Sequence, residues 1–182
     1  MLAGFWLSCS PKEKPNTKGS AKKEPYVLEF EDTVTIDQYE GSNLAWVLKT
    51  TYLTKAEKTG KLFVKPLRMV FYDSLGKESA HIKSDSGAAD ENISFVSVWG
   101  NVYAESSDGM LVEADSLIWK KNTKRIETEG WVKVVTEDKD TLTGVGFTSD
   151  DRLKNWKILS DIRTVIQKVE NRVNESEEKE EP

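Results

Sequence analysis

Across residues 26–169 apolar side chains alternate with polar ones, and turn-forming residues interrupt the alternation about every ten residues. Near the start of this region the alternation places Trp46 and Leu48 on one face of an extended strand. Asp108 and Gly109 form a pair typical of a tight hairpin turn. Extended segments are predicted at 46–52, 62–72, 80–84, 93–99, 102–106, 111–114, 117–120, 126–128, 131–136 and 141–148. Short strands without a helical pattern between them predict an all-β domain, which would be a sandwich, a barrel or a jelly roll.

The last apolar segment, 158–169, fits two structures. Its apolar residues match helical spacing, yet Ile158, Ile162 and Ile166 also lie on one face of a strand. We predict a strand, because Thr164-Val165-Ile166 is rich in β-branched residues and every preceding segment is β.

A β unit is repeated inside the domain. The segment that begins at Gly100 and the segment that begins at Gly130, 30 residues later, each open with glycine, continue with alternation and end in a turn. A short strand follows each of them, at 111–114 and 142–145, and a weaker copy covers 72–84. Repeated units of this kind predict stacked hairpins that together bury one continuous apolar face.

The two ends of the chain differ from the middle. Residues 1–9 are apolar up to Cys9 and resemble a truncated or partial signal segment with a lipobox, in which the cysteine is acylated. Residues 10–25 contain five Lys against two Glu and predict a flexible linker. Residues 170–182 contain six Glu against two basic residues and predict a disordered acidic tail. The folded domain is therefore expected at 26–169.

Two features of the N-terminus depart from a lipoprotein signal. Only eight residues precede Cys9, and none of them is Lys or Arg. Trp6 also stands where the usual lipobox has leucine. These departures leave two alternatives open. The true start could lie upstream of Met1, or Cys9 could be an ordinary, unmodified cysteine.

Composition excludes several classes of function. The chain has 26 Lys and Arg against 31 Asp and Glu, a net charge of −5, so no nucleic-acid partner is expected. With one histidine, His81, and one cysteine, Cys9, the chain lacks the ligands of a zinc cluster, and any Ser-His-Asp or Cys-His site would have to use His81. We predict no catalytic residues, no metal site and no cofactor, and we expect His81 at the surface or at a strand edge.

Six motifs follow one another over about residues 34–166. They are Trp46-Val-Leu-Lys-Thr, Pro66-Leu-Arg-Met-Val-Phe-Tyr-Asp-Ser-Leu-Gly-Lys, Trp99-Gly-Asn-Val-Tyr-Ala, Asp108-Gly-Met-Leu-Val-Glu-Ala-Asp-Ser-Leu-Ile-Trp, Ile126-Glu-Thr-Glu-Gly-Trp-Val and Leu142-Thr-Gly-Val-Gly-Phe-Thr-Ser-Asp. In this order and spacing they resemble the LptC family, the periplasmic component C of the lipopolysaccharide transport bridge.

This resemblance implies a twisted antiparallel β jelly roll, OstA/LptA-like, whose hollow carries the acyl chains of lipopolysaccharide. It implies a non-enzymatic bridge component that receives lipopolysaccharide from an inner-membrane ATP-driven transporter and passes it to the next β domain. The implied partners are lipopolysaccharide, the β domains of the inner-membrane lipopolysaccharide ABC transporter, and a periplasmic bridge β protein that joins through edge strands. Many family members carry an N-terminal transmembrane helix. A lipid anchor at Cys9 would stand in its place here, which favours a periplasmic location at the inner membrane.

The alternation also nominates the inner face that would hold acyl chains. The expected lipid-binding residues are Trp46, Leu48, Phe63, Val102, Ala104, Leu117, Trp119, Ile126, Val132, Val134, Leu142 and Gly144. Each of them would fit a packed core as well. Gly144 and Gly146 fall on one face of a strand, which predicts either a strip without side chains or a close approach of backbone.

The first strand, about 26–36, and the last, about 156–169, are predicted to be free edges to which partner β domains add their strands. Glu29, Glu31 and Asp32 are equally suited to blunt the first edge. The alternative function is that of a non-lipid structural or adhesion β-stack on a surface lipoprotein. A third, a carbohydrate-active β enzyme, would require two carboxylates that face each other in a cleft.

Overall fold

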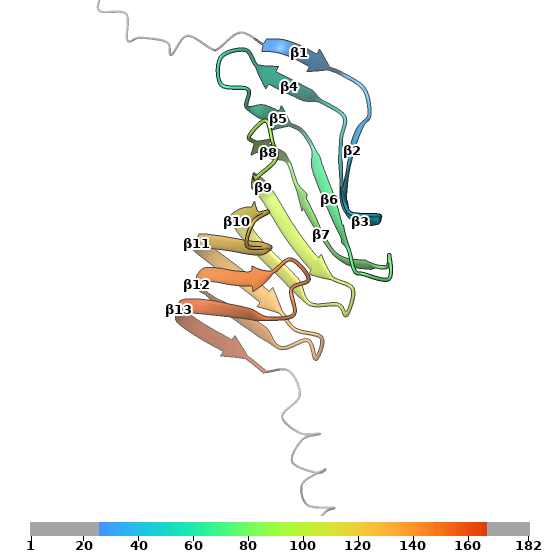
Figure 1. Ribbon diagram of the computed structural model, residues 1–182. Helices are drawn as coiled ribbons and strands as arrows, with labels where there is room; N and C mark the ends of the chain where they lie inside the picture. The colour runs from blue at the N-terminus through green and yellow to red at the C-terminus, as the bar shows by residue number, and fades with distance from the viewer. Residues whose placement is uncertain (1–25, 167–182) are drawn as a thin grey trace, which may run out of the picture.

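The computed structural model describes residues 26–166, which form thirteen strands and no helix (Figure 1). The strands are β1 (Tyr26–Phe30), β2 (Val34–Glu40), β3 (Asn43–Thr50), β4 (Leu53–Ala56), β5 (Leu62–Val64), β6 (Leu67–Tyr72), β7 (Glu78–Ser84), β8 (Ser86–Ala89), β9 (Phe95–Ser106), β10 (Leu111–Lys120), β11 (Arg125–Val135), β12 (Thr141–Asp150) and β13 (Trp156–Val165). Within this part of the chain no helix exists that could cross a membrane.

All strands belong to one antiparallel sheet that divides at β9. The first part of β9 pairs with β8, and the path continues to β5, β4 and β1. The second part of β9 pairs with β7, and that path continues to β6, β3 and β2. Figure 1 shows these two arms converging on β9, below which β10 to β13 are stacked. We call the side with β1, β4, β5 and β8 the β1 layer, and the other side the β2 layer.

Each long strand contributes to both layers because it bends near its middle. The pairings of β9 to β13 all shift register at this point, at residues 99–102, 114–118, 128–131 and 143–145. In the first half of the chain the bend divides each long strand into two shorter ones. Strands β3 and β4 thus correspond to the two halves of one bent strand, as do β7 and β8. The sheet thereby folds over lengthwise and encloses an interior between the two layers.

Several bends contain proline or residues with a positive φ angle. Pro66 lies between β5 and β6, directly before the first residue of β6. Gly100 and Asn101 have positive φ angles of 76° and 46° in β9, as do Gly146 in β12 (75°) and Asp161 in β13 (51°). Gly, Asn and Asp adopt this region more readily than other residues. The bends are therefore encoded locally.

Apolar side chains from both layers fill the interior. The ring of Trp119, in the β1 layer, lies 5.6 Å from the rings of Trp46 and Phe71 in the β2 layer, measured between centroids. Such aromatic pairs contribute about 0.5–1.5 kcal/mol each beyond their buried area. Other almost fully buried core residues are Leu48, Leu67, Met69, Ile82, Val96, Val98, Val102, Ala104, Val112, Leu117, Ile126, Val132, Val134, Phe147 and Leu153.

The predicted all-β architecture of stacked hairpins is confirmed, although several strand boundaries differ from the predicted ones. The turn at Asp108-Gly109 is present, with the Gly109 N–H donating to the Ser106 carbonyl at 3.0 Å. Segments predicted as separate strands, such as 93–99 and 102–106, are one bent strand. The predicted first strand, 26–36, is instead two strands, β1 and β2. The predicted strand at 158–169 is confirmed as far as Val165, and residues 167–182 and 1–25 lie outside the described part of the chain.

Candidate functional site: the interior and its open edges

The structure gathers most of the predicted inner-face residues between the two layers. Nine of them are buried apolar side chains of one core cluster: Trp46, Leu48, Val102, Ala104, Leu117, Trp119, Ile126, Val132 and Val134. Leu142 is half-buried and packs against this cluster, and Gly144 is buried. The alternation therefore identified the correct face of strands β3, β9, β10, β11 and β12.

Phe63 is the exception. Its side chain is 38% exposed, while its neighbours Leu62 and Val64 belong to the interior. The prediction treated 62–72 as one strand, in which Phe63, Leu67 and Met69 share a face. The bend at Lys65-Pro66 shifts the alternation by one residue, because β5 and β6 lie in different layers. Phe63 consequently lies on the outer face of the β1 layer.

The two glycines of β12 mark close approaches rather than an open strip. A Cβ at Gly144 would collide with the Ile158 side chain and lie 2.7 Å from the Ser160 carbonyl oxygen. A Cβ at Gly146, which also has a positive φ, would lie 3.0 Å from Leu159. Of the two interpretations of these glycines, the structure therefore supports the close approach of β13 to β12.

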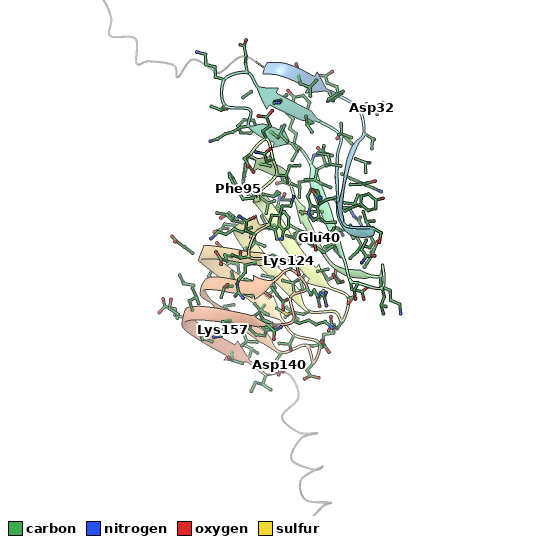
Figure 2. All side chains as sticks on the ribbon, viewed as in Figure 1. Asp32, Glu40, Phe95, Lys124, Asp140 and Lys157 are labelled. Atoms are coloured by element: carbon green, nitrogen blue, oxygen red, sulfur yellow. The ribbon has the colours of Figure 1, made fainter. Side chains whose placement is uncertain are left out.

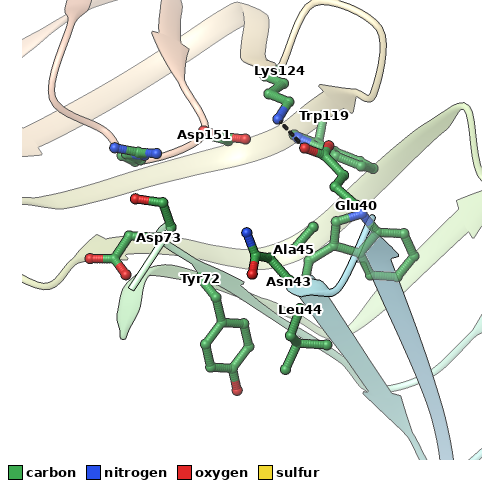
Figure 3. Close-up of a pocket in the computed structure, with 12 residues that line it drawn as sticks. Glu40, Asn43, Leu44, Ala45, Tyr72, Asp73, Trp119, Lys124 and Asp151 are labelled. Carbon is green, nitrogen blue, oxygen red and sulfur yellow. Dashed lines mark hydrogen bonds and ion pairs between the residues drawn. The ribbon is translucent and has the colours of Figure 1, made fainter. Parts of the chain in front are cut away.

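A cavity of 260 Å³ opens on the side of the interior away from the bends (Figure 3). We call it the mouth. Its walls come from the β2–β3 turn, the β6–β7 turn, and the turns after β10 and β12. The lining residues include Glu40, Ala45, Trp46, Trp119 and Lys124. The indole N–H of Trp119 is buried there without a hydrogen-bond partner among the described residues, so the mouth offers one unused donor.

Polar contacts join the two layers at the mouth. Lys124 Nζ lies 2.7 Å from Glu40 Oε2, and Lys121 Nζ donates to Gln38 Oε1 at 3.1 Å. Figure 2 labels Glu40 and Lys124, and Figure 3 shows their contact beside Trp119. We call these two contacts the clasp. Both side chains of the ion pair are about half exposed, so its contribution to stability is small, about 0–1 kcal/mol.

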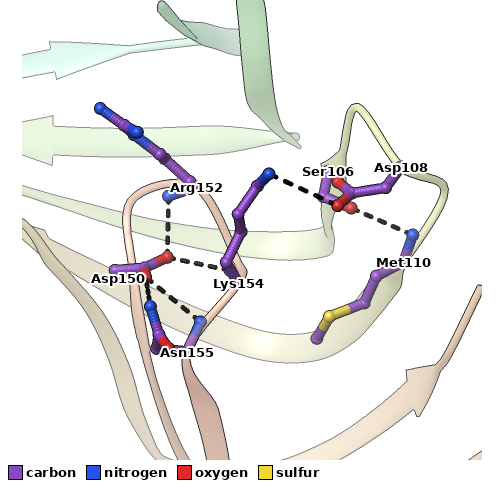
Figure 4. A network of polar contacts seen from close by, with 7 residues as sticks. All are labelled: Ser106, Asp108, Met110, Asp150, Arg152, Lys154 and Asn155. Carbon is purple, nitrogen blue, oxygen red and sulfur yellow. Dashed lines mark hydrogen bonds and ion pairs between the residues drawn. The ribbon is translucent and has the colours of Figure 1, made fainter. Parts of the chain in front are cut away.

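Charged groups of the β12–β13 turn complete the rim of the mouth. Burial raises the pKa of the Asp151 carboxyl group, although Lys124 and Arg152 oppose this shift. Asp150 organises the turn (Figure 4): its carboxylate accepts hydrogen bonds from Asn155 Nδ2 at 2.6 Å and from the backbone N–H of Lys154 at 2.9 Å. Burial alone would raise the pKa of Asp150, but these hydrogen bonds outweigh it and hold that pKa below its usual value.

The ends of the sheet are open edges. Within the described residues β1 pairs only with β4, β2 only with β3, and β13 only with β12. Apolar side chains are exposed at both ends: Leu28, Phe30 and Tyr39 at one, and Leu159, Ile162, Val165 and Ile166 at the other. Glu29, which was equally suited to blunt the first edge, accepts a hydrogen bond from the Tyr52 hydroxyl at 2.5 Å.

His81, predicted at the surface or at a strand edge, lies at the surface of the sheet and not at an edge strand. It lies in β7, between β6 and β9, and is half-buried on the outer face of the β2 layer. Its Nε2 lies 3.2 Å from Glu105 Oε2. Burial, followed by the charge of Lys83, lowers the pKa of His81, and Glu105 opposes this shift. Across residues 26–166 no three His, Cys, Asp or Glu side chains come together in a way that could hold a metal ion.

Comparisons with known proteins agree with this architecture. A family model described as "Lipopolysaccharide-assembly, LptC-related" matches residues 1–167, which confirms the resemblance indicated by the sequence motifs. A similar solved structure is that of LptH, the LptA homologous periplasmic component of the conserved lipopolysaccharide transport device from Pseudomonas aeruginosa. The TM-score is 0.52 at 13% identity, over 68% of this chain and 95% of that chain, so the likeness shows the fold. No curated protein sequence gives a significant match.

Proposed function

Because the chain belongs to the LptC-related family of lipopolysaccharide-assembly proteins, we propose that it carries lipopolysaccharide with the acyl chains held between its two layers. Proteins of this family are non-enzymatic components of the lipopolysaccharide transport bridge in the periplasm, so its work is transport and not catalysis. The observation that carries the proposal is an apolar interior bounded by two layers whose sheet ends in open edges.

The proposed lipid contacts are the inner-face residues that the structure gathers. They are Trp46, Leu48, Val102, Ala104, Leu117, Trp119, Ile126, Val132, Val134, Leu142 and Gly144. Phe63 is left out because it faces the other way.

Loading requires the layers to part at the mouth, because the rings of Trp46, Phe71 and Trp119 are in contact across the interior. The costs are modest. Opening breaks the two clasp contacts, of which the exposed ion pair contributes about 0–1 kcal/mol and the hydrogen bond about 0.5–1.5 kcal/mol. It also separates aromatic pairs that contribute about 0.5–1.5 kcal/mol each beyond their buried area. Each acyl methylene that leaves water returns about 0.8 kcal/mol. A few methylenes per chain therefore offset the opening.

Transfer between proteins would use the open edges. A β domain of the inner-membrane lipopolysaccharide ABC transporter at one edge, and a periplasmic bridge β protein at the other, would extend the sheet and make the interior continuous. The exposed apolar residues Leu159, Ile162 and Val165 suit such strand addition at β13.

The anchor is the remaining part of the proposal. Acylated Cys9 would hold the domain at the inner membrane, and residues 10–25 would act as its spacer. Replacing Cys9 with Ala should then abolish labelling by a fatty-acid analogue, and labelling that persists would exclude Cys9 as the modified residue.

Site-specific photo-crosslinking tests the lipid contacts. A benzophenone amino acid at buried Trp46 or Trp119 should capture lipopolysaccharide supplied to the purified protein. The matched controls are Trp99 and Trp131, which are 41% and 45% exposed, and the same probe there should capture none. Circular dichroism must show the β signal of each variant. Folded inner-face variants that capture no more lipid than the controls would refute the proposal and leave the alternative, a structural β-stack, which the filled core favours.

A further inference from the structure

Three basic residues stand side by side on the outer face of the β2 layer. Lys49 of β3 is directly opposite Arg68 of β6, and Arg68 is directly opposite Lys83 of β7. All three are exposed, and their neighbours along the strands, such as Leu48 and Ile82, point into the core. Adjacent strands lie about 4.8 Å apart, so the three charges fall within roughly 10 Å. We call them the basic row.

The basic row is electrostatically costly, because like charges directly opposite each other on neighbouring strands destabilise a sheet. None of the three side chains forms an ion pair with another residue of 26–166. Further along the same cross-strand line the charges are complementary: Glu113 is directly opposite Lys133, and the two form an ion pair of 3.1 Å. Charge is thus balanced where Glu113 faces Lys133 and unbalanced where Lys49, Arg68 and Lys83 face one another.

A cavity of 370 Å³ adjoins the basic row, and all three of its residues line the cavity. It runs along the bends of neighbouring strands, where the exposed Pro66 provides apolar surface. Asp85 contributes the one carboxylate of its lining, and that carboxylate accepts a hydrogen bond from Asn101 Nδ2 at 2.7 Å. Three cations therefore face a shared hollow with a single anion, which leaves a local excess of positive charge.

The chemistry of these side chains favours a phosphate group. A guanidinium group binds phosphate in a bidentate manner, and lysines on both sides add point charges. Apolar surface next to the cations suits a ligand that carries a hydrocarbon portion beside its phosphate. Thr33, in the connection from β1 to β2, lines the same cavity, which places it at the N-terminal end of the sheet.

We propose that the basic row and its cavity bind the phosphate headgroup of an anionic lipid. This site lies on the outside of the β2 layer, apart from the interior in which acyl chains are proposed to travel. Its existence does not depend on the transport function, and it would hold the N-terminal end of the domain against a membrane surface.

Vesicle binding tests the proposal. The full chain is used with Cys9→Ser, so that no anchor contributes. It should sediment with phosphatidylcholine vesicles that contain phosphatidylglycerol and much less with vesicles of phosphatidylcholine alone. Replacing Lys49, Arg68 and Lys83 together with Gln should weaken this binding by roughly 100-fold. The matched control replaces Lys61, Lys77 and Lys139, which are exposed elsewhere, with Gln; the net charge changes equally and binding should change less than about threefold.

A second variant distinguishes lost binding from lost folding. Lys83→Glu would place a carboxylate opposite Arg68, so it should raise the thermal midpoint and still weaken vesicle binding at least about tenfold. Equal binding by the basic-row variant and its control, or equal binding to both kinds of vesicle, would overturn the proposal. Pyrophosphate distinguishes the source of the phosphate. If it binds the basic row as tightly as the vesicles do, the ligand is a soluble phosphate compound and the lipid assignment is wrong.

Discussion

Glu40, at the end of β2, and Lys124, in the turn after β10, form an ion pair of 2.7 Å that joins the two layers at the mouth of the interior. These residues are 84 positions apart in the sequence. The pair is exposed and therefore weak, yet it lies at the mouth, where the proposed loading would begin. A contact with these properties is suited to gating, because breaking it lowers the free energy of unfolding only slightly.

The first prediction concerns this gate. Lys124→Gln should lower the free energy of unfolding by less than about 1 kcal/mol, because both partners are half exposed. It should increase the rate of lipid capture by a photo-crosslinker at Trp119. The control is Lys55→Gln, which removes an ion pair with Glu91 away from the mouth and should leave capture unchanged. An unchanged capture rate in Lys124→Gln would show that the Glu40–Lys124 ion pair does not limit entry.

A second prediction compares two tryptophans. Trp119→Ala should destabilise the domain by about 3–5 kcal/mol, because the ring is buried against Trp46 and Phe71 and its loss leaves a cavity. Trp131→Ala should cost about 1 kcal/mol or less, since that ring is 45% exposed on the outer face. Urea unfolding of both variants measures the difference. Similar losses would mean that the interior of the folded protein is already loosely packed.

The inner face was predictable where large apolar residues alternate without interruption. In β11 the charged Lys133 stands between Val132 and Val134 and identifies the outer face. In β9 the polar Asn101 and Glu105 flank the segment that contains Val102 and Ala104. The alternation failed at Phe63 because the bend at Pro66 changes which face points inward. It also missed two strands of four residues, β4 and β8. In β8, Ser86-Gly-Ala-Ala contains no large side chain to reveal a period.

Contacts between the layers were beyond the reach of sequence reasoning. The clasp and the Trp46–Trp119 pair depend on how far the sheet twists and folds over, and neither propensity nor alternation determines these quantities. The basic row could be seen only after the register was known, because Lys49, Arg68 and Lys83 are far apart in sequence and meet through strand pairing.

The third prediction tests the close approach of β12 and β13. Gly144→Ala should destabilise the domain by about 1–3 kcal/mol, because the added methyl group collides with Ile158 and the Ser160 carbonyl. Gly130→Ala is the matched control, since its Cβ would meet only Thr128 Oγ1 at 3.5 Å, and its stability should change little. Thermal unfolding measures both. If Gly144→Ala were neutral, β13 would not pack on β12 as closely as the structure shows.

A fourth prediction concerns the β13 edge. Ile162 and Val165 are 55% and 63% exposed, so replacing both with Lys should alter the unfolding free energy by less than about 1 kcal/mol. Lysines on an open edge block strand addition, so association with a partner β domain should fall at least about tenfold. Size-exclusion chromatography of the mixed proteins measures association. Unimpaired association would place the partner at the other edge, formed by β1 and β2.

The last prediction is a pH dependence centred on His81. Its pKa is lowered in the folded protein, first by burial and then by Lys83, so the unfolded chain binds the proton more tightly. The contribution of His81 to stability is therefore complete above its ordinary pKa of about 6.5 and is lost as the pH falls through the lower folded value. Lys83→Gln should raise the pKa of His81 in an NMR titration, and Glu105→Gln should lower it further.

Measurements of stability against pH provide an independent check that protonation of His81 is coupled to unfolding. The loss of unfolding free energy on acidification below pH 6.5 should be smaller in His81→Gln than in the unmodified protein, because Gln does not take up the proton. An equal loss in both proteins would assign the acid sensitivity to other groups. A pKa of His81 that did not respond to Lys83→Gln would show that the charge of Lys83 does not reach the β7 histidine.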